Sequence, residues 1–420
     1  MRPLPPLPDW ISLEHQVAQI LTEQEIHGWY FDERAAWELE SALRREYENT
    51  SQLLRKRHPF VRGSEFTPKR NNKTKGYIEG CSFTKLKELN PTSRDHIAWL
   101  LQTHYGWTPL LTTSTGKPVI DEPVLKEIGT DIALHFFRLL ELTKQLGMIS
   151  EGVNAWQKLC TRSKRIHHHC SVATSTFRCA HRKPNLAQVP SDERFRRLFT
   201  ASPGKRLVGA DLSGIELRML AHYLARYDGG RYASVLLHGD VHQENADKIG
   251  ISRAQVKTVT YAFLYGAGDQ RIGQAYDKQL SDDQKRLKGK EIRKAYVDAI
   301  PGLKELLEAV HKASERGYLL GLDHRRILVD SRHKSLNYLL QGSAAIIAKR
   351  WMVLANEHSL ETAQQVAFIH DELQFEVQPK EVDDLKFTLE LTAVMSGEHY
   401  GLRIPIAAES KSGHSWADVH

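Results

Sequence analysis

The sequence has 420 residues, 41% hydrophobic and 26% charged, a composition typical of a globular chain with one large domain or two or three smaller ones. It contains no run of about 18 apolar residues. Its N-terminus, MRPLPPLPDW, has no apolar signal core, so we expect neither a membrane span nor a targeting peptide. Four cysteines are too few for a disulfide framework, which favours a reducing, cytoplasmic compartment.

The positive charge is concentrated in two segments. The formal net charge is +7 and the pI is about 9.0. Eleven Lys or Arg and two acids lie within 161–206, and eight Lys or Arg and one acid lie within 55–75. Such clusters indicate a polyanionic partner, and the plain alternative is a solvated surface.

The periodicity of apolar residues predicts a helix-rich α+β protein with a small sheet that carries acids. In chain order, helices are predicted at 11–57, 90–101 (capped by Thr92 or Ser93), 131–160, 214–226, 252–265, 282–316, 335–358 and 381–397. Strands are predicted around 166–172 and 205–211, and a hairpin at 365–378. The stretch 58–80 is rich in Gly, Asn and Lys and lacks periodicity, so it is predicted to be a loop.

The segment RLVGADLSGIELR joins a short apolar strand to an amphipathic helix. Asp211 ends the strand, Ser213 and Gly214 interrupt it, and Glu216 follows in the first helical turn. A strand end can deliver its side chain to a cleft, so Asp211 is a candidate site residue. The alternative is a helix N-cap with a first-turn acid, both of which are common.

The segment SRAQVKTVTYAFLYGAGD repeats a functional residue type every four positions: Arg253, Lys257, Tyr261 and Tyr265. Each step advances by roughly 400°, so the row drifts by only about 40° and follows one helix face until two glycines end the helix. Two cations followed by two rings suit a nucleotide, because cations bind phosphates and a ring stacks on a sugar or base. The alternative is a solvated face with two half-buried tyrosines.

The third segment, VAFIHDELQFEV, places acids at the centre of an apolar hairpin. A turn at His370 and Asp371 can point a carboxylate at the cleft that holds Asp211. Two carboxylates from different strands, with phosphates present, suit two metal ions about 3.5–4 Å apart. Mg²⁺ accepts such oxygen ligands and keeps several waters, so metal ions would explain acids among apolar strands.

These three segments resemble motifs A, B and C of the family A DNA polymerases: DLSGIELR (211–218), RAQVKTVTYAFLYGAGD (253–269) and IHDE (369–372). The likeness, which points to the replicative polymerases of T-odd bacteriophages, continues through PDWISLEHQ, NPTSRDHI, PNLAQVP, LAHYLARYDGGRYA, GDVH, SLNYLLQGSAA and WADVH. It implies a DNA-directed DNA polymerase of DNA replication, located in the host cytoplasm if a phage encodes it. It also implies a right-hand fold, with a thumb at 1–160, a palm at 161–225 and 336–420, and fingers at 226–335.

The resemblance assigns the chemistry of nucleotidyl transfer. Asp211 and Asp371 would hold two Mg²⁺ ions, with the carbonyl of Leu212 assisting. Arg253 and Lys257 would bind the β- and γ-phosphates of a dNTP, and Lys257 would protonate the leaving pyrophosphate. Motion of this helix would close the site on a correct base pair.

The resemblance also assigns the contacts to nucleotide and DNA. His242 would bind the triphosphate, Tyr261 would stack on the incoming sugar, and Tyr265 would guard the template position. Glu216 would lie under C2′ of the sugar, exclude a ribose hydroxyl and hydrogen-bond Tyr261. Primer-template DNA would be contacted by Arg178, Asn337, Gln341 and His370, the last at the primer terminus.

Four departures from the family pattern qualify these expectations. The chain starts almost directly at the thumb-like segment, so we expect no 3′–5′ proofreading in it and consider a separately encoded exonuclease as a partner. The stretch 58–90 is too short for the insertion with which some phage polymerases recruit thioredoxin, so that partner is not expected. The family's Thr-Gly-Arg is Thr176-Phe177-Arg178 here, and a usual glycine is His324.

Three alternatives stay open. A single-subunit RNA polymerase shares the palm and a similar helix, although Glu216 argues against it. A catalytically silent DNA-binding subunit is the non-enzymatic option. The stretch RIHHHCSVATSTFRCAHRKP, with His and Cys residues between His167 and His181, could bind zinc, but its ligand spacing is not that of a structural zinc site.

Overall fold

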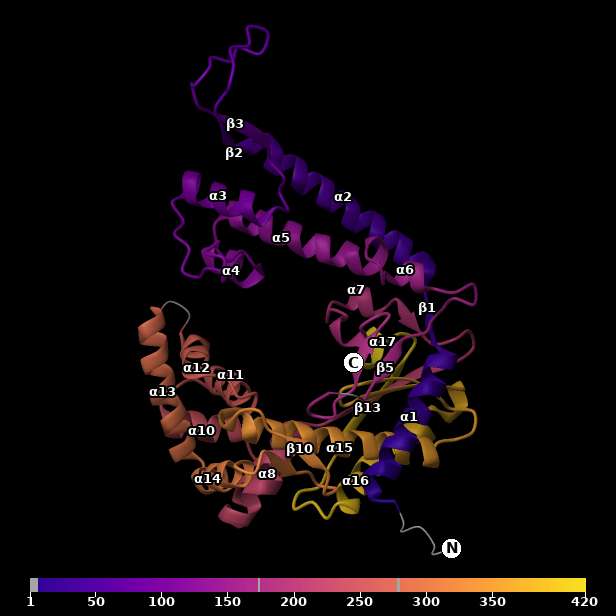
Figure 1. The fold of residues 1–420 in the computed structure, drawn as a ribbon. Coiled ribbons are helices and arrows are strands. Elements are labelled where there is room, and N and C mark those ends of the chain that lie inside the picture. The colour runs from indigo at the N-terminus through magenta and orange to yellow at the C-terminus, as the bar shows by residue number, and fades with distance from the viewer. Residues whose placement is uncertain (1–6, 173, 278–279) are drawn as a thin grey trace, which may run out of the picture. The chain divides into compact units, whose positions relative to one another are not determined.

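A computed structural model describes residues 7–172, 174–277 and 280–420 of the chain (Figure 1). The chain forms two compact units, one made of residues 32–160 and the other of the described residues on either side of that segment. The predicted thumb therefore does not coincide with one unit. Helix α1 (Asp9–His27) and strand β1 (Trp29–Phe31) belong to the larger unit, because the apolar face of α1 joins the larger unit's core. The assignment of thumb, palm and fingers stays a prediction.

The smaller unit is mainly helical around a core that includes Leu54, Leu101 and Phe136. Its elements are α2 (Glu33–Arg57), β2 (Phe60–Phe66), β3 (Phe83–Glu88), α3 (Arg94–Tyr105), α4 (Glu122–Ile128), α5 (Asp131–Leu146), a π-helical turn (Gly147–Glu151) and α6 (Trp156–Leu159). Ser93 caps α3, as predicted. The prediction of a loop at 58–80 was wrong in part, since β2 pairs with β3 as a largely exposed ribbon, and exposed faces leave no apolar alternation to detect.

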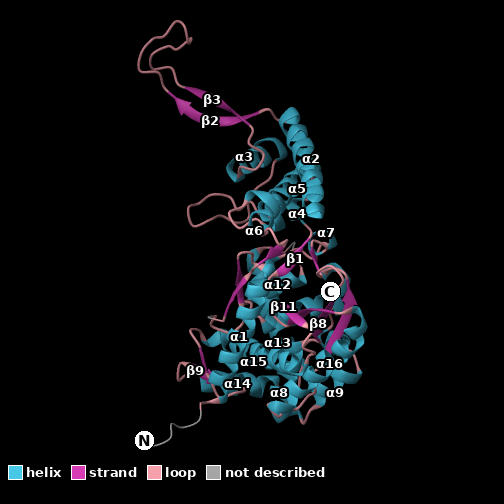
Figure 2. Ribbon diagram, turned by 90° about the vertical axis from the view of Figure 1, so that its right-hand side faces the viewer, coloured by secondary structure: helices cyan, strands magenta, loops and turns pink. Residues whose placement is uncertain are grey.

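The larger unit is built on a four-stranded antiparallel sheet in the order β11-β12-β8-β13. Its strands are β8 (Arg206–Leu212), β11 (Gln364–Ile369), β12 (Glu372–Val377) and β13 (Ala408–Gly413). Helices α15 (Ser335–His358) and α16 (Val382–His399) pack together, and α16 also contacts β8 and β13 (Figure 2). Helix α15 is buried on nearly every side, which agrees with the apolar residues on all of its faces.

Short strands and further helices complete the larger unit. The short strands are β4 (Arg165–Ile166), β5 (His169–Ser171), β6 (Ala180–Arg182), β7 (Phe199–Thr200), β9 (Tyr318–Leu320) and β10 (Arg326–Leu328). The helices are α7 (Glu193–Arg196), α8 (Ile215–Asp228), α9 (Arg231–His238), α10 (Val241–Ile249), α11 (Arg253–Leu264), α12 (Asp269–Tyr276), α13 (Asp282–Ala299), α14 (Leu303–Ser314) and α17 (Trp416–Val419).

Three predicted helices are interrupted. The helix predicted at 11–57 is broken by β1, which follows a glycine in the left-handed region (Gly28, φ 69°). The helix predicted at 282–316 is broken at Pro301-Gly302, where Gly302 has a φ of 81°. The helix predicted at 131–160 leaves α-helical geometry after Leu146. No helix in the described ranges combines the length and hydrophobicity that crossing a membrane requires.

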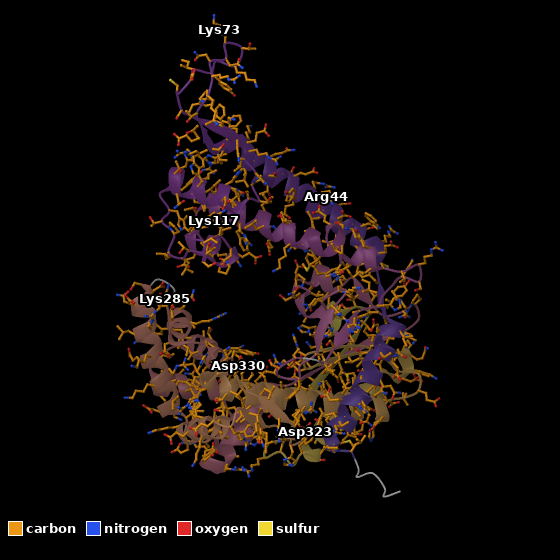
Figure 3. The ribbon with its side chains drawn as sticks, viewed as in Figure 1. Arg44, Lys73, Lys117, Lys285, Asp323 and Asp330 are labelled. Carbon is orange, nitrogen blue, oxygen red and sulfur yellow. The ribbon has the colours of Figure 1, made fainter. Side chains whose placement is uncertain are left out.

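A buried ionic cluster ties α1 to the centre of the larger unit. Lys349 of α15 is 1% exposed and donates to both carboxylate oxygens of Glu14 at 2.7 Å. Arg325, 4% exposed, also bonds Glu14, and it pairs with Asp323 (labelled in Figure 3) at 2.6 Å. Because each buried cation has a carboxylate partner, the charges are tolerated in the core.

A second buried acid, Glu376 on β12, links the sheet to the segments that carry His27 and Ser202. One of its oxygens accepts from the backbone and hydroxyl of Ser202 at 2.9 and 2.6 Å, and the other lies 2.6 Å from His27 Nε2. Burial alone would raise the pKa of Glu376. The hydrogen bonds from His27 and Ser202, with the Lys205 ammonium, instead hold the pKa well below its ordinary value of 4.5.

This depressed pKa predicts a pH-dependent contribution to stability. The contribution is present above the ordinary value of 4.5 and is lost as the pH falls towards the depressed folded value. Glu376→Gln is therefore expected to lower the free energy of unfolding by about 3 kcal/mol near neutral pH, and by much less near pH 3. Urea unfolding of both proteins at the two pH values measures the gap, with Glu361→Gln on the surface as the control. A gap that does not change with pH would contradict this assignment.

Candidate active site

The predicted acids of the first and third segments lie at the same edge of the central sheet. Asp211 is near the end of β8, and the two-residue turn of His370 and Asp371 joins β11 to β12. The backbone N–H of Leu212 donates to the carbonyl of Asp371 at 3.0 Å, which fixes the turn beside the end of β8. In the register of β12 and β8, Glu372 lies opposite Asp211. Asp211 and Asp371, predicted to act together, are thus brought to one place.

The two carboxylates repel each other in poorly hydrated surroundings. Crowding by protein atoms, with the carboxylate of Glu372 adding, raises the pKa of Asp211 to about 6, although its side chain reaches the surface. Burial, with the carboxylates of Asp211 and Glu216 adding, raises the pKa of Asp371 to about 7. A group of acids whose ionised forms are disfavoured in this way is stabilised by a bound cation.

The acid next to Asp371 has a different environment. Glu372 is 4% exposed and accepts hydrogen bonds from Trp416 Nε1 at 2.7 Å and Gln374 Nε2 at 2.5 Å. Its second oxygen lies 3.0 Å from Nδ1 of His420, the last residue of the chain. Glu372 therefore holds the C-terminal segment against the sheet, and the catalytic role predicted for Asp371 stays a prediction.

The predicted stripe on α11 is formed on the exposed side of that helix. Ser252 and Gln255 build a capping box at its start. The interior face holds Val256, Val259, Thr260, Phe263 and Leu264, whereas Arg253, Lys257 and Tyr265 are exposed and Tyr261 is half-buried. The geometry inferred from four-residue spacing is confirmed.

Two further residues adjoin the stripe. Arg253 Nε donates to Asp240 Oδ2 at 2.7 Å, and Lys257 makes no ion pair within the described part of the chain. The ring of His242, on α10, lies 6.3 Å from the ring of Tyr261. Burial lowers the pKa of His242, and Arg253 and Lys257 lower it further while Asp240 opposes them. The two cations and this histidine therefore share one region of positive potential.

Glu216 connects the end of α11 to the loop between β5 and β6. Its Oε1 accepts from Arg178 Nη2 at 2.6 Å and from Tyr265 Oη at 3.0 Å. The expected hydrogen bond from Glu216 to Tyr261 is not formed. Tyr265 takes that place, because it lies at the C-terminal cap of α11. Tyr265 also lines an open cavity of about 700 Å³ together with Tyr261 and the glycines that follow α11.

The remaining predicted DNA contacts lie on α15 and at the hairpin turn. Asn337 is 9% exposed and donates from Nδ2 to the carbonyl of Leu264 at 2.8 Å, so it caps α11. Gln341, one helical turn later, is half-buried. His370 is exposed and has a φ of 61°. Their contacts with DNA stay predictions.

Both local departures from the family pattern occur where the backbone has a left-handed conformation. Phe177 has a φ of 61° and His324 a φ of 63°, values that favour glycine. The Arg325 guanidinium lies 4.8 Å from the centre of the Phe177 ring, a contact that offsets strain there. His324 is exposed, and among the described residues it has no such contact.

His324→Gly is therefore expected to stabilise the protein by about 1 kcal/mol, because it removes left-handed strain without losing packing. Thermal unfolding measures the change. His333→Gly, at an exposed position with negative φ, is the control and is expected to destabilise. A lower melting temperature for His324→Gly would refute the strain argument.

Two of the histidines considered for zinc bond Glu25 instead, and two others lie in the core. His167 Nδ1 lies 2.8 Å from the carbonyl of Glu25, and His169 Nδ1 lies 2.8 Å from the Glu25 carboxylate. His168 and His181 are buried with ring centres 5.7 Å apart. In the described ranges, no three His, Cys, Asp or Glu side chains are grouped so that they could hold a metal ion by themselves.

Two groups of residues near the site were not predicted from the sequence. Asp240 caps α10 by accepting from the backbone of His242 and Gln243, and it also orients Arg253. Its position before an amphipathic helix is an N-cap signal that could have identified it. Trp416 and His420 hold Glu372, and no local pattern indicates that contact.

Comparison with known proteins gives a consistent result. Residues 67–418 match the family described as DNA polymerase family A. The chain is 30% identical to the DNA-directed DNA polymerase of Escherichia phage T7, over 98% of this chain and 70% of that protein. It is 28% identical to DNA polymerase I of Pseudomonas aeruginosa, over 80% of this chain and 39% of that protein. Its fold is similar to the POL domain of Pol1 from M. smegmatis, which was solved in complex with DNA primer-template and dNTP. The TM-score is 0.76 and the sequence identity is 21%. The likeness covers 97% of this chain and 70% of that one.

Proposed function

This chain belongs to DNA polymerase family A and is a DNA-directed DNA polymerase, and we propose that Asp211 and Asp371 carry its nucleotidyl transfer. The predicted α+β right-hand fold is confirmed by the structural likeness. The observation that carries the proposal is the pairing of β8 with the hairpin turn, where Leu212 N–H donates to Asp371 at 3.0 Å and brings the two acids together.

Polymerases of this family use divalent metal ions, and we propose two Mg²⁺ ions at this edge. The residues present fit such ions, because Asp211, Asp371 and the Leu212 carbonyl offer hard oxygen donors where negative charge is crowded. Few protein ligands suffice, since Mg²⁺ takes its remaining oxygens from water and substrate phosphates. When bound, the ions supply charge stabilisation at the α-phosphate and lower the pKa of the primer 3′-hydroxyl.

The residues of α11 and α10 would bind the incoming dNTP. Arg253 and Lys257 hold its β- and γ-phosphates, and His242 adds a third contact. Lys257 donates a proton to the pyrophosphate as it leaves. Its ammonium group carries that proton and can transfer it directly to a phosphate oxygen. Tyr261 stacks on the sugar. Most of the rate enhancement then comes from positioning of the dNTP and from stabilisation of charge in the transition state.

DNA would lie against the remaining predicted residues. Arg178, Asn337 and Gln341 contact the minor groove of the primer-template, and His370 contacts the primer terminus. Groove acceptors occur at every base pair, so these contacts sense pair geometry rather than sequence. Tyr265 occupies the template position while it is bonded to Glu216, and α11 must move to release it. A separately encoded exonuclease as a partner stays a prediction.

Primer extension with dNTPs or rNTPs tests this function and the role of Glu216 together. The wild-type chain is expected to extend a DNA primer with dNTPs and to reject rNTPs. In Glu216→Ala the space under C2′ opens, so the preference for dCTP over CTP in kcat/KM is expected to fall by roughly 10²-fold. Glu361→Ala is the matched surface control. Loss of dNTP extension without any gain of rNTP extension would show that Glu216 does not act on the sugar.

The same primer-extension assay distinguishes DNA synthesis from RNA synthesis and from DNA binding without catalysis. Extension by the wild type with rNTPs alone would move the assignment to RNA synthesis. DNA binding without extension under either nucleotide would reject the proposed catalytic roles. A 3′-mismatched primer in a parallel lane measures whether the chain shortens primers.

A further inference from the structure

Helix α16 carries apolar side chains on two faces. Its buried face, which includes Leu385 and Leu389, packs against α15 and the central sheet. On the opposite face, Phe387 is 67% exposed and Leu391 is 45% exposed. Val394 follows them and is half-buried. A helix that covers one side of a core needs apolar residues on one face alone, so the fold of this chain does not account for the second apolar face.

The apolar residues of the second face form a continuous ridge. Phe387, Leu391 and Val394 have the spacing i, i+4 and i+7. Each residue turns a helix by about 100°, so the three side chains lie within an arc of about 60°. The ridge extends for about 10 Å, because each residue rises by about 1.5 Å. Ridges with this spacing pack into the groove of a second helix, whereas ordinary surfaces expose apolar residues singly.

Acidic side chains border this ridge on both sides. Asp383 and Glu390 lie on one side of it and Asp384 lies on the other, each within about 60° of its centre, and all three are exposed. Within the described residues none of the three forms an ion pair, and Glu390 accepts from the neutral hydroxyl of Ser410. Lys386 of the same helix lies about 100° away around the axis. The ridge is therefore flanked by negative charge that no neighbouring cation neutralises.

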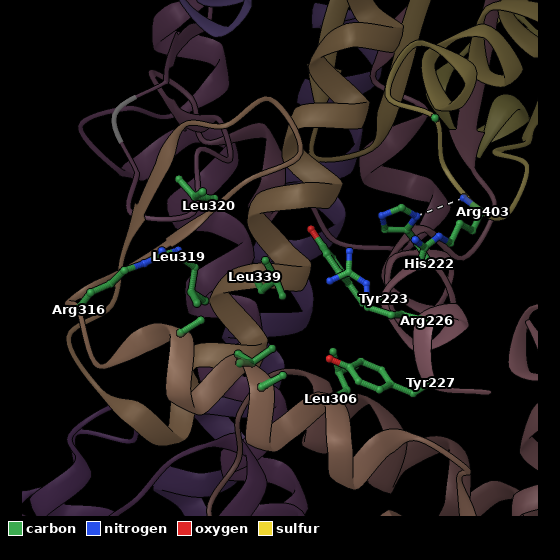
Figure 4. A pocket seen from close by; sticks show the side chains of 14 residues that line it. His222, Tyr223, Arg226, Tyr227, Leu306, Arg316, Leu319, Leu320, Leu339 and Arg403 are labelled. Atoms are coloured by element: carbon green, nitrogen blue, oxygen red, sulfur yellow. Dashed lines mark hydrogen bonds between the residues drawn. The ribbon is translucent and has the colours of Figure 1, made fainter. Parts of the chain in front are cut away.

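Other surfaces of the larger unit carry the opposite charge. The cavity between α8, α14 and β9 is about 350 Å³ in volume and is lined by Arg226, Arg316 and Arg403 and, among the described residues, by no Asp or Glu (Figure 4). His222 there accepts from the backbone N–H of Arg403 at 3.2 Å, and burial, with the Arg403 and Arg226 charges adding, lowers its pKa to about 4. The face of α16 is thus acidic within a chain whose formal net charge is +7. Its acids would repel a polyanion, which excludes nucleic acid as its occupant.

We propose that the exposed face of α16 docks a basic amphipathic helix of a partner protein, whose apolar stripe covers Phe387 and Leu391 and whose lysines or arginines pair with the flanking acids. Burial of the ridge would supply the affinity, and the charges would select the partner and its orientation. About two turns of a partner helix would cover the ridge. None of these residues belongs to the set assigned to catalysis, nucleotide or DNA, so this inference is independent of the proposed function.

Fluorescence anisotropy of a labelled peptide tests the proposal on the full chain. The probe is a fluorescein-labelled helical peptide with leucines at every third or fourth position and lysines on both flanks. No DNA is added, because the lysines would bind it. Phe387→Ser/Leu391→Ser removes two side chains that the probe would bury, so it is expected to raise the Kd at least about tenfold. The matched double variant Leu53→Ser/Leu134→Ser, at exposed positions on α2 and α5, should leave the Kd unchanged.

Two further variants distinguish this face from other acidic surfaces. Asp383→Asn/Asp384→Asn keeps the ridge and removes two charges, so the Kd should rise by at least about threefold at low ionic strength and by less at high salt. Asp371→Asn removes an acid at the proposed catalytic site and should leave the Kd unchanged. The melting temperature and primer extension of both α16 variants should equal those of the wild type.

Three results would overturn the proposal. The first is absence of binding to the wild type, or equal binding by the wild type and Phe387→Ser/Leu391→Ser. The second is equal binding of a probe that has the same composition but leucines spread over all of its faces. The third is a dimer of the wild type, measured by analytical ultracentrifugation, that Phe387→Ser/Leu391→Ser dissociates, because the occupant of the face would then be a second copy of this chain.

Discussion

Asp371→Asn is expected to reduce the rate of primer extension by at least about 10³-fold while the protein stays folded. The substitution keeps the size of the side chain and removes a charge where burial, with the carboxylates of Asp211 and Glu216 adding, raises the pKa of the carboxyl to about 7. If Asp371 holds Mg²⁺ as proposed, the variant would lack a charged metal ligand, and the charge stabilisation that the ion would supply to the reaction would be lost. Folding gains instead, because a repulsive charge has gone, and the melting temperature should not fall.

Single-turnover extension in Mg²⁺ and thermal unfolding measure the two effects in one preparation. Asp384→Asn, on the exposed first turn of α16, is the matched control and should behave as the wild type in both assays. Affinity for primer-template DNA without metal should also be unchanged in Asp371→Asn. Extension within tenfold of the wild type, or a marked loss of thermal stability, would show that Asp371 has a structural role.

Gly289→Ala is expected to destabilise the protein by at least about 3 kcal/mol, because it forces two helix backbones apart. A Cβ at Gly289 on α13 would lie 1.7 Å from the carbonyl oxygen of Asp269 on α12, and one at Gly273 would lie 1.8 Å from the carbonyl oxygen of Lys285. Backbone atoms cannot rotate away as a side chain can. Helix α12 directly follows α11, so primer extension should fall as well, by at least about tenfold.

Urea unfolding, limited proteolysis and primer extension measure this effect. Gly147→Ala is the control, since no atom of the described residues lies within 4 Å of the position that a methyl group would take there and its φ of −57° is helical. Alanine there should be neutral or stabilise by up to about 1 kcal/mol. If Gly289→Ala unfolds like the wild type, the close approach of α12 and α13 is not required for folding.

Local rules predicted the elements of the site well. The repeat of four residues from Arg253 to Tyr265 predicts that these side chains share one face of α11, because helical geometry depends only on residues within a turn or two. Ser93 caps its helix as predicted, and the strand that carries Asp211 and the hairpin at 365–378 occur within one or two residues of their predicted bounds. Each of these features is determined by neighbouring residues along the chain.

Exposed and strained segments were less predictable. The β2–β3 ribbon was missed because both of its faces meet solvent and give no alternation of apolar residues. Phe177 and His324 adopt left-handed backbone angles although neither is a glycine, and both lie in connections between paired strands. Composition and periodicity carry no information about such positions.

The sequence by itself determined the secondary structure of the site, the chemical types of its residues and, through its motifs, the family. The sequence also predicted that Asp211 and Asp371 act together, and the tertiary structure decided by which contacts they meet. It brought Asp211 beside Asp371, some 160 residues later, through strand pairing. It buried Glu372 against the C-terminal segment and joined Glu216 to Tyr265 instead of Tyr261. These outcomes depend on which distant segments the core brings together, because side-chain partners are chosen by packing and desolvation rather than by spacing along the chain.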